Sequence, residues 1–267
     1  MGALESRFMI AELNGARICY DVQGEGDPVL LIGGFGANRR FWKELVGLMD
    51  GHTLVTFDNR GVGDTEYSGG FTIDDLADDA VALMSHLGFG TFHVIGWSMG
   101  SLIVQSMMLR HGDVLRDAVL MSTYIDRPAR STYVLGEFAR MVCEGTASME
   151  SLHVMINTLV FSEGVFRDLE RAGVRMSVPM RMERPEGLAD QLMAVQGFHP
   201  GDDLSRITTP VLVIQGTEDI MIPFSNGEAV RDIIPGAELL AVEGAGHNIP
   251  PIAYHTAVSE FFSKHPE

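Results

Sequence analysis

Residues 92–110 read FHVIGWSMGSLIVQSMMLR, and this stretch decides the fold. Residues 92–95 are typical of a short buried strand, and residues 101–110 are typical of a helix. Between them stands the motif G-x-S-x-G, with Ser98 at its centre. A serine in such a tight turn is held above the edge of a sheet. The flanking glycines are needed because a Cβ at either position would collide with the neighbouring strand or helix. The motif therefore predicts that Ser98 is a nucleophile.

Short apolar runs recur on both sides of this motif. They occupy residues 29–32, 53–57, 93–96, 118–121, 210–215 and 238–242. Runs this apolar are typical of strands buried on both faces. Helical periodicity lies between them, at residues 73–87, 225–234 and 252–263. Thr72 and Asp75 predict a capping box at the start of the first of these helices. Strands alternating with helices predict an α/β fold built on a parallel sheet that is covered on both faces.

Residues 124–203 break this alternation. They contain no convincing strand, seven of the sixteen Met and eight of the nineteen basic residues, all of them Arg. We interpret this stretch as a helical cap inserted into a core made of residues 1–123 and 204–267. The methionines form an adaptable apolar surface for ligands or pack the cap's own core. The arginines recognise an anionic substrate or form solvated ion pairs on helix faces.

The charge balance and the cysteine count exclude several classes of protein. The 267 residues carry 36 Asp and Glu against 19 Lys and Arg, a formal net charge of −17 at pH 7. Such a surface repels phosphate backbones and anionic head groups, so we expect no nucleic-acid partner and no membrane docking. Residues 1–7 lack the pattern of a secretory signal, and a cytoplasmic location is expected. Cys19 and Cys143 are predicted to be two buried thiols, and no residue spacing predicts a metal site.

Two further residues complete a candidate catalytic triad with Ser98. Asp219 follows the strand predicted at 210–215, and His247 follows the strand predicted at 238–242. Open parallel sheets place their ligand sites at the carboxyl ends of strands, so the three side chains are expected to converge. The His247 imidazole would take the serine proton, and the Asp219 carboxylate would orient the imidazole. Glu218 and Asp126 are rival acids.

An acyl-transfer serine also needs N–H donors for the oxyanion. We predict one donor at Met99, directly after the nucleophile, and another at Phe35 in the glycine-rich loop of residues 33–36. Arg39 and Arg40 follow this loop and are a candidate anion site. Candidate substrate-binding residues lie beside these groups or at apolar positions of the predicted cap: Gly34, Trp97, Phe138, Met141, Met155, Leu159 and Phe198.

With these motifs in place, the chain resembles the α/β-hydrolase fold family over nearly its full length. The matching stretches are residues 33–36, 57–65, 96–100, 216–223 and 244–247. Within that family it is similar to bacterial enol-lactonases, esterases and cofactor-free haloperoxidases or perhydrolases. The resemblance implies a mostly parallel eight-stranded sheet flanked by helices, a helical cap after the sixth strand, a Ser-His-Asp triad and no cofactor. Two departures stand out. Gly33 replaces a histidine that supports the oxyanion loop in many relatives, and Ser101 replaces a further glycine.

These features predict a serine hydrolase that cleaves a carboxylic ester or lactone through an acyl-enzyme intermediate. Carbon–carbon bond hydrolysis and perhydrolysis use the same triad, so both remain open. A lyase or cyclase role in biosynthesis and a triad-bearing small-molecule receptor also remain open, because a fold does not assign a function. The sequence leaves the natural substrate open, and it also leaves open whether the chain forms a homo-oligomer.

Overall fold

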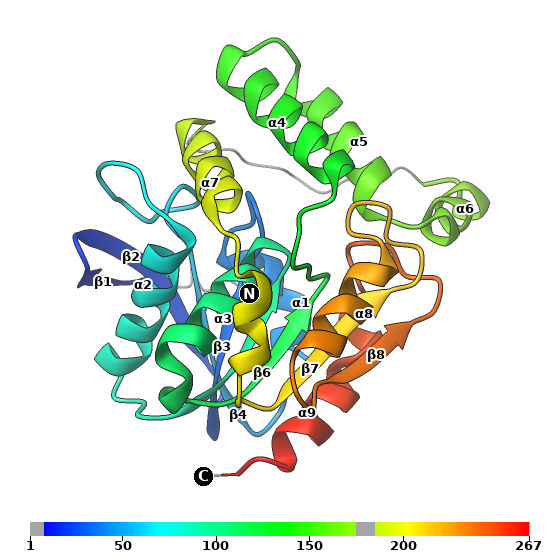
Figure 1. Cartoon of the computed structure of the whole chain (residues 1–267). Coiled ribbons are helices and arrows are strands. Elements are labelled where there is room, and N and C mark those ends of the chain that lie inside the picture. The colour runs from blue at the N-terminus through cyan, green and yellow to red at the C-terminus, as the bar shows by residue number, and fades with distance from the viewer. Residues whose placement is uncertain (1–7, 175–184, 267) are drawn as a thin grey trace, which may run out of the picture.

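A computed structural model describes residues 8–174 and 185–266 of the chain, and a twisted eight-stranded sheet lies at its centre (Figure 1). The strands are β1 (Met9–Leu13), β2 (Ala16–Gln23), β3 (Asp27–Ile32), β4 (His52–Phe57), β5 (Phe92–Trp97), β6 (Leu115–Met121), β7 (Val211–Gly216) and β8 (Glu238–Val242). They lie in the order β1-β2-β4-β3-β5-β6-β7-β8. β2 pairs antiparallel with β1 and β4, and the remaining pairs are parallel. The predicted α/β fold is therefore confirmed, and the β1–β2 hairpin is the part that no apolar run indicated.

Side chains of the central strands alternate between two apolar layers. In β3, Leu30 and Ile32 face one layer, whereas Val29 and Leu31 face the other. Helices α2 (Ile73–His86), α3 (Met99–His111) and α8 (Phe224–Ile233) cover the first layer, and α1 (Lys43–Val46) and α9 (His255–Ser263) cover the second. Because both faces of the sheet are buried, these strands read as continuous apolar runs rather than as alternating patterns.

The predicted capping box at the start of α2 is present. The Asp75 N–H donates to Thr72 Oγ1 at 3.1 Å, and the Thr72 N–H donates back to Asp75 Oδ2 at 2.8 Å. Two of the N–H groups that a helix start leaves without an acceptor are thereby satisfied. Asp74 and Asp75 also place negative charge at the positive end of the helix dipole.

In the described part of the stretch that the sequence marked as an insertion, four helices connect β6 to β7, and together they are called the cap below. They are α4 (Ala129–Glu144), α5 (Met149–Val160), α6 (Glu163–Ala172) and α7 (Pro185–Gly197), and a 3-10 helix, Gly201–Arg206, leads into β7. Figure 1 shows these four helices gathered at one end of the sheet. α4, α5 and α7 share a small apolar cluster that includes Phe138, Leu152 and Leu188. Among all helices of the described ranges, none has both the length and the hydropathy needed to cross a bilayer.

Candidate active site

The turn between β5 and α3 holds Ser98 in a strained backbone conformation. Its φ is 55° and its ψ is −116°, a combination that L-residues rarely adopt. A Cβ at Gly96 would lie 2.3 Å from the carbonyl oxygen of Gly100, and a Cβ at Gly100 would lie 2.1 Å from that of Ile32. Both glycines are therefore required by close backbone approach. Ser101, at the position where the resemblance led us to expect glycine, donates its hydroxyl to the Ser98 carbonyl at 2.6 Å.

Ser98, His247 and Asp219 form one continuous hydrogen-bonded chain. His247 Nε2 lies 3.0 Å from Ser98 Oγ, and His247 Nδ1 lies 2.8 Å from Asp219 Oδ2. The three residues follow β5, β8 and β7, so the carboxyl ends of three strands bring them together. His247 and Asp219 are buried, while Ser98 is half-buried and reaches the cavity described below. This is the geometry in which an imidazole accepts a serine proton.

The Asp219 carboxylate is held by donors on both of its oxygens. Oδ1 accepts from the backbone N–H groups of Met221 and Ile222, each at 2.8 Å. Oδ2 accepts from Gln215 Nε2 at 3.2 Å in addition to His247. Glu218 and Asp126, the rival acids, are both exposed, and within the described residues neither shares a hydrogen bond with His247.

Two side chains at the ends of β5 and β6 hold the backbone carbonyl of His247. Trp97 Nε1 donates to this oxygen at 3.0 Å, and Ser122 Oγ donates to it at 2.9 Å. Ser122 is fully buried, directly follows β6 and has a φ of +50°, the left-handed region that favours glycine. Sequence reasoning missed Ser122. Its only sequence signal was its position directly after β6. In the sheet, β6 lies between β5, which leads to Ser98, and β7, which leads to Asp219.

The loop that follows β3 is supported from the cap. Gly36 N donates to Gln191 Oε1 at 2.9 Å, and Gln191 Nε2 donates to the carbonyl of Arg60 at 2.9 Å. The buried Gln191 reaches the loop because α7 docks closely, so that a Cβ on Gly61 would lie 2.6 Å from the Gly187 carbonyl. Gln191 of α7 thus supports the loop that follows β3, and sequence reasoning did not identify it.

The two predicted oxyanion donors are the N–H groups of Phe35, in the loop after β3, and of Met99, at the start of α3. Within the described residues the Phe35 N–H donates to no protein acceptor. Met99 is the first residue of α3, so its N–H has no acceptor inside the helix. Both amides are therefore available to a ligand placed at Ser98.

A cavity of about 80 Å³ opens at the Ser98 hydroxyl and is called the catalytic cavity below. Side chains from the core and from α4 and α5 line it, and most of them are apolar: Phe35, Gly36, Trp97, Ser98, Ser131, Leu135, Phe138, Ile156, Val160, Met221 and His247. Of the predicted substrate-binding residues, Trp97 and Phe138 line this cavity. Ser131 was not predicted. It is 2% exposed, and its hydroxyl has no hydrogen-bond partner within the described residues.

The structure places the other predicted pocket residues elsewhere. Met141 and Met155 pack against the cap's apolar cluster, and Leu159 and Phe198 pack against the layer beneath α2 and α3. Gly34 lies behind Trp97, where a Cβ would come within 2.8 Å of the indole ring. These apolar side chains satisfy packing inside the protein, the usual fate of such residues, rather than lining the cavity.

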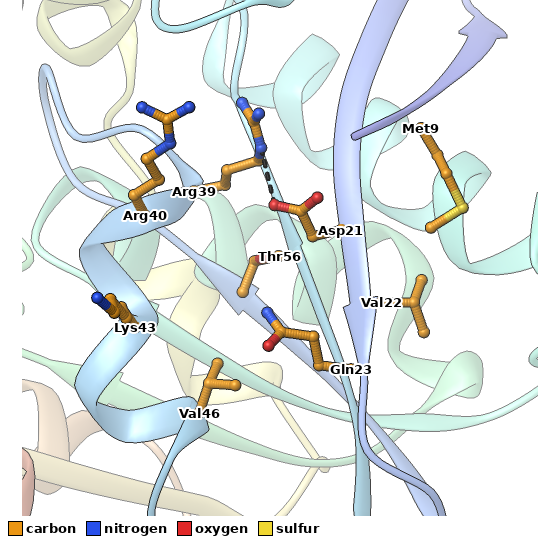
Figure 2. Close-up of a pocket in the computed structure, with 9 residues that line it drawn as sticks. All are labelled: Met9, Asp21, Val22, Gln23, Arg39, Arg40, Lys43, Val46 and Thr56. Carbon is orange, nitrogen blue, oxygen red and sulfur yellow. Dashed lines mark hydrogen bonds and ion pairs between the residues drawn. The ribbon is translucent and has the colours of Figure 1, made fainter. Parts of the chain in front are cut away.

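The candidate anion site at Arg39 and Arg40 is not supported, because Arg39 is already neutralised. Its guanidinium pairs with Asp21 at 2.9 Å and with Asp64 at 2.9 Å, and it also contacts Asp58. Figure 2 shows Arg39 bonded to Asp21 among the residues that line a separate cavity. This cavity has a volume of about 470 Å³, and no triad residue lines it. Arg40 stands on the short helical segment that borders this cavity and is exposed.

Several cap arginines form ion pairs within their own helices. Arg140 pairs with Glu137 at 2.8 Å and with Glu144 at 2.6 Å. Arg167 and Arg171 pair with acids three or four residues away at 3.3 and 3.4 Å. These spacings are those of solvated helix-face pairs rather than of a substrate-binding cluster. Arg175, Arg181 and Arg184 lie outside the described residues.

Cys19 lies beside a carboxylate pair that Arg39 already occupies. Its sulfur and one oxygen each of Asp58 and Asp64 lie within 4.8 Å of one another. Since the Arg39 guanidinium contacts both carboxylates, a metal ion placed there would be repelled by a fixed positive charge. The arrangement is therefore a buried ion-pair cluster with a neighbouring thiol.

The two thiols differ in environment, which corrects the prediction that both are buried. Cys143 is exposed on α4, whereas burial raises the pKa of the Cys19 thiol to about 12. Below that pH Cys19 stays a protonated, unreactive thiol. At pH 8 we expect a thiol reagent such as dithiobisnitrobenzoate to modify Cys143 rapidly and Cys19 only after guanidinium unfolds the chain. Cys143→Ser protein should show no fast phase, and a persistent fast phase in that variant would contradict the assignment.

Comparison with known proteins places these features in one family. A family model of the alpha/beta hydrolase fold matches residues 27–251. BpoC of Mycobacterium tuberculosis (strain H37Rv), provisionally named a non-heme bromoperoxidase, is 32% identical over 257 residues, 92% of this chain and 97% of that protein. The enol-lactonase from Burkholderia xenovorans LB400 has a TM-score of 0.84 at 24% identity, covering 96% of this chain and 100% of that one. A thermophilic esterase from Thermogutta terrifontis has a TM-score of 0.84 at 25% identity, covering 98% and 100%.

Proposed function

Because the chain belongs to the alpha/beta hydrolase fold family, we propose that it is a serine hydrolase that cleaves a carboxylic ester or lactone. One observation carries this proposal: the unbroken hydrogen-bonded chain from Asp219 through His247 to Ser98, at 2.8 and 3.0 Å, which ends in a cavity. A buried acid, a buried imidazole and a strained serine together cost stability, and such an arrangement is typical of catalytic sites.

In the proposed mechanism, Ser98 Oγ attacks the substrate carbonyl carbon while its proton moves to His247 Nε2. The carbonyl oxygen becomes an oxyanion that accepts hydrogen bonds from the Phe35 and Met99 N–H groups. As the C–O bond to the leaving alcohol breaks, His247 returns the proton to that oxygen. A water molecule then gives a proton to His247 and attacks the acyl carbon. The acyl–Oγ bond breaks as His247 gives this proton to Ser98 Oγ, which releases the acid and restores both residues.

The catalytic cavity favours a small acyl group. Its volume of 80 Å³ is well below the roughly 300–1,000 Å³ of pockets that enclose drug-sized ligands. Apolar side chains dominate its walls. The Ser131 hydroxyl has no hydrogen-bond partner within the described residues, so it is available to a polar group of the substrate. We therefore expect short acyl esters or small lactones to be the better substrates. Two structural neighbours are named an enol-lactonase and an esterase, which supports lactones and esters as the kinds of bond cleaved.

Perhydrolysis is a second candidate, and the 32% identity to a protein named as a bromoperoxidase favours it. In that reaction hydrogen peroxide, instead of water, attacks the acyl-enzyme and releases a peracid. The same residues take part, because only the second nucleophile differs. The test measures peracid formation from an ester and hydrogen peroxide together with hydrolysis of the same ester. The ratio of the two products gives the fraction of acyl-enzyme that reacts with peroxide rather than with water.

The proposal is tested by the hydrolysis of p-nitrophenyl acetate and butyrate, with a panel of γ- and δ-lactones measured alongside. We expect steady-state turnover of many substrate molecules per chain, and the panel ranks lactones against open esters. A single stoichiometric event without further turnover would point to a receptor, and a folded protein without any reaction would overturn the proposal.

Replacement of Gln191 by Leu is expected to lower kcat for the best ester about tenfold. The change removes the support of the oxyanion loop, and losing an oxyanion donor outright costs about a hundredfold or more. It also leaves the Gly36 N–H and the Arg60 carbonyl without their partner, which costs about 1–3 kcal/mol of stability for each group.

Two further variants separate positioning from general destabilisation. Gln191→Glu keeps the acceptor for the Gly36 N–H but still removes the donor to the Arg60 carbonyl, so if the loop's position matters it should recover most of kcat without recovering all of the lost stability. Gln196 lies on the same helix but is exposed, so Gln196→Leu should leave kcat unchanged. Equal kcat values for Gln191→Leu and wild type, measured well below the melting temperature of each, would contradict the assigned role.

A further inference from the structure

The catalytic cavity has a larger neighbour on the other side of Trp97. This second cavity has a volume of about 440 Å³ and lies between α1, α6 and the segment that leads into α9. Within the part of the chain that the structure describes, Trp97 is the residue that lines both cavities. Its indole contacts His247, which lines the catalytic cavity, and Phe41, which lines the second, so the ring lies between the two and is called the wall below.

The backbone also passes between the two cavities. It does so twice: Val160 lines the catalytic cavity and Phe161 the second one, and His247 and Asn248 divide in the same way. The Asn248 N–H donates to the Val160 carbonyl at 2.8 Å and joins the two crossings. Side-chain substitution leaves these crossings in place, whereas the indole of Trp97, the described residue that lines both cavities, can be made smaller.

The indole is also held in place. It stacks on Phe41 with ring centroids 4.3 Å apart and an angle of 13° between the planes, and its Nε1 donates to the His247 carbonyl at 3.0 Å. A ring with a stacking partner on its face and a hydrogen bond at its edge is not free to swing aside. The wall therefore stays in place in the wild-type protein.

The second cavity suits a hydrocarbon chain. Apolar and aromatic residues such as Trp42, Val165, Ile249 and Tyr254 line it, and all four are buried or half-buried. The charged residues that border it, Arg40, Lys43 and Glu44, are exposed. Burial of apolar surface is consequently the main attraction that this space offers to a ligand.

We propose that Trp97 is the specificity-determining wall that confines the acyl group of the substrate to the catalytic cavity and excludes longer acyl chains from the second cavity. The inference rests on the proposed ester hydrolysis and identifies the substrate class as short-chain acyl esters. Trp97→Ala should open the catalytic cavity into the second one, so that an acyl chain of eight carbons can extend into it.

The test compares kcat/KM for p-nitrophenyl butyrate and octanoate. In Trp97→Ala we expect the octanoate-to-butyrate ratio to rise at least about tenfold, since each buried methylene favours binding roughly fourfold. Trp97→Phe retains a ring in the wall and should keep the wild-type ratio, although it loses the hydrogen bond to His247. Ser122→Ala loses the equivalent hydrogen bond without touching the wall, so it should lower kcat for both esters and leave their ratio unchanged.

A second substitution shows where the longer chain goes. Val165→Trp fills the second cavity, so in the Trp97→Ala background it should abolish the gain for octanoate while butyrate hydrolysis persists. An unchanged ratio in folded Trp97→Ala protein would overturn the proposal, as would a gain that survives Val165→Trp. If Trp97→Ala does not fold, Trp97→Leu opens a smaller passage, and a rise in its ratio is still required.

A binding experiment tests the wall separately from the proposed function. If wild-type protein turns over no ester, the hydrolase proposal fails, and the wall is then tested by binding of butyrate and octanoate to Ser98→Ala protein by NMR titration. Octanoate should bind measurably more tightly to the Ser98→Ala/Trp97→Ala protein than to Ser98→Ala alone, whereas butyrate should not. Equal octanoate affinities would refute the wall without reference to catalysis.

Discussion

Ser98→Ala is expected to lower kcat for p-nitrophenyl butyrate by about 10³- to 10⁶-fold, since loss of the nucleophile removes the acyl-enzyme route and leaves only binding and oxyanion stabilisation. Ser101 is not a substitute nucleophile because its hydroxyl is buried and donates to the Ser98 carbonyl at 2.6 Å. The exposed Ser225 on α8 offers a matched control, and Ser225→Ala should retain full activity.

The same variant is checked by covalent labelling. An alkyl fluorophosphonate should add one adduct to wild-type protein and none to Ser98→Ala, as measured by intact mass and located by peptide mapping. Near-wild-type turnover by carefully purified Ser98→Ala protein would show that the mechanism is wrong. An adduct on Ser131, which also lines the catalytic cavity, would identify a different nucleophile.

Asp219→Asn is expected to lower kcat by about 10³- to 10⁴-fold. The backbone N–H groups of Met221 and Ile222 both donate to Oδ1, so the amide oxygen of an asparagine would remain there. The amide nitrogen would then face His247 Nδ1 and make that atom an acceptor. The imidazole proton would move to Nε2, which faces Ser98 and could no longer take the serine proton.

The neighbouring acid provides the control for this prediction. Glu218→Gln removes one negative charge one residue away, but the side chain is exposed and should leave kcat within about twofold, since exposed charges are strongly screened. The measurement is kcat and KM for both variants at pH 7 and at fixed ionic strength. A loss with Glu218→Gln comparable to that with Asp219→Asn would reassign the acid.

The parts of the fold that the sequence predicted are those with local signals. The turn at Ser98 carries its own requirement for two glycines, and the strands before Asp219 and His247 are apolar because both faces are buried. Each residue's position at a strand end therefore follows from its immediate neighbours. The β1–β2 hairpin was missed because it lies at the edge of the sheet, where Met9 and Ile10 are exposed and apolar runs are short.

The lining of the catalytic cavity was only partly predicted. Phe138 faces it, but Met141 lies three residues further along α4 and packs in the cap's apolar cluster. Helical periodicity indicates which residues share a face, yet it does not say which face the docked cap turns toward Ser98. Ser131, a polar residue at the start of α4, was overlooked for the same reason.

The sequence by itself determined the α/β fold, the turn that presents Ser98 and the two loops that carry Asp219 and His247, because each depends on residues adjacent in the chain. Tertiary structure alone decided that Gln191 supports the loop after β3 and that Trp97 holds the His247 carbonyl and lies between two cavities. These contacts join residues 155 and 150 positions apart. They depend on how closely the cap and the strand-end loops dock on the sheet, and no local pattern encodes that distance.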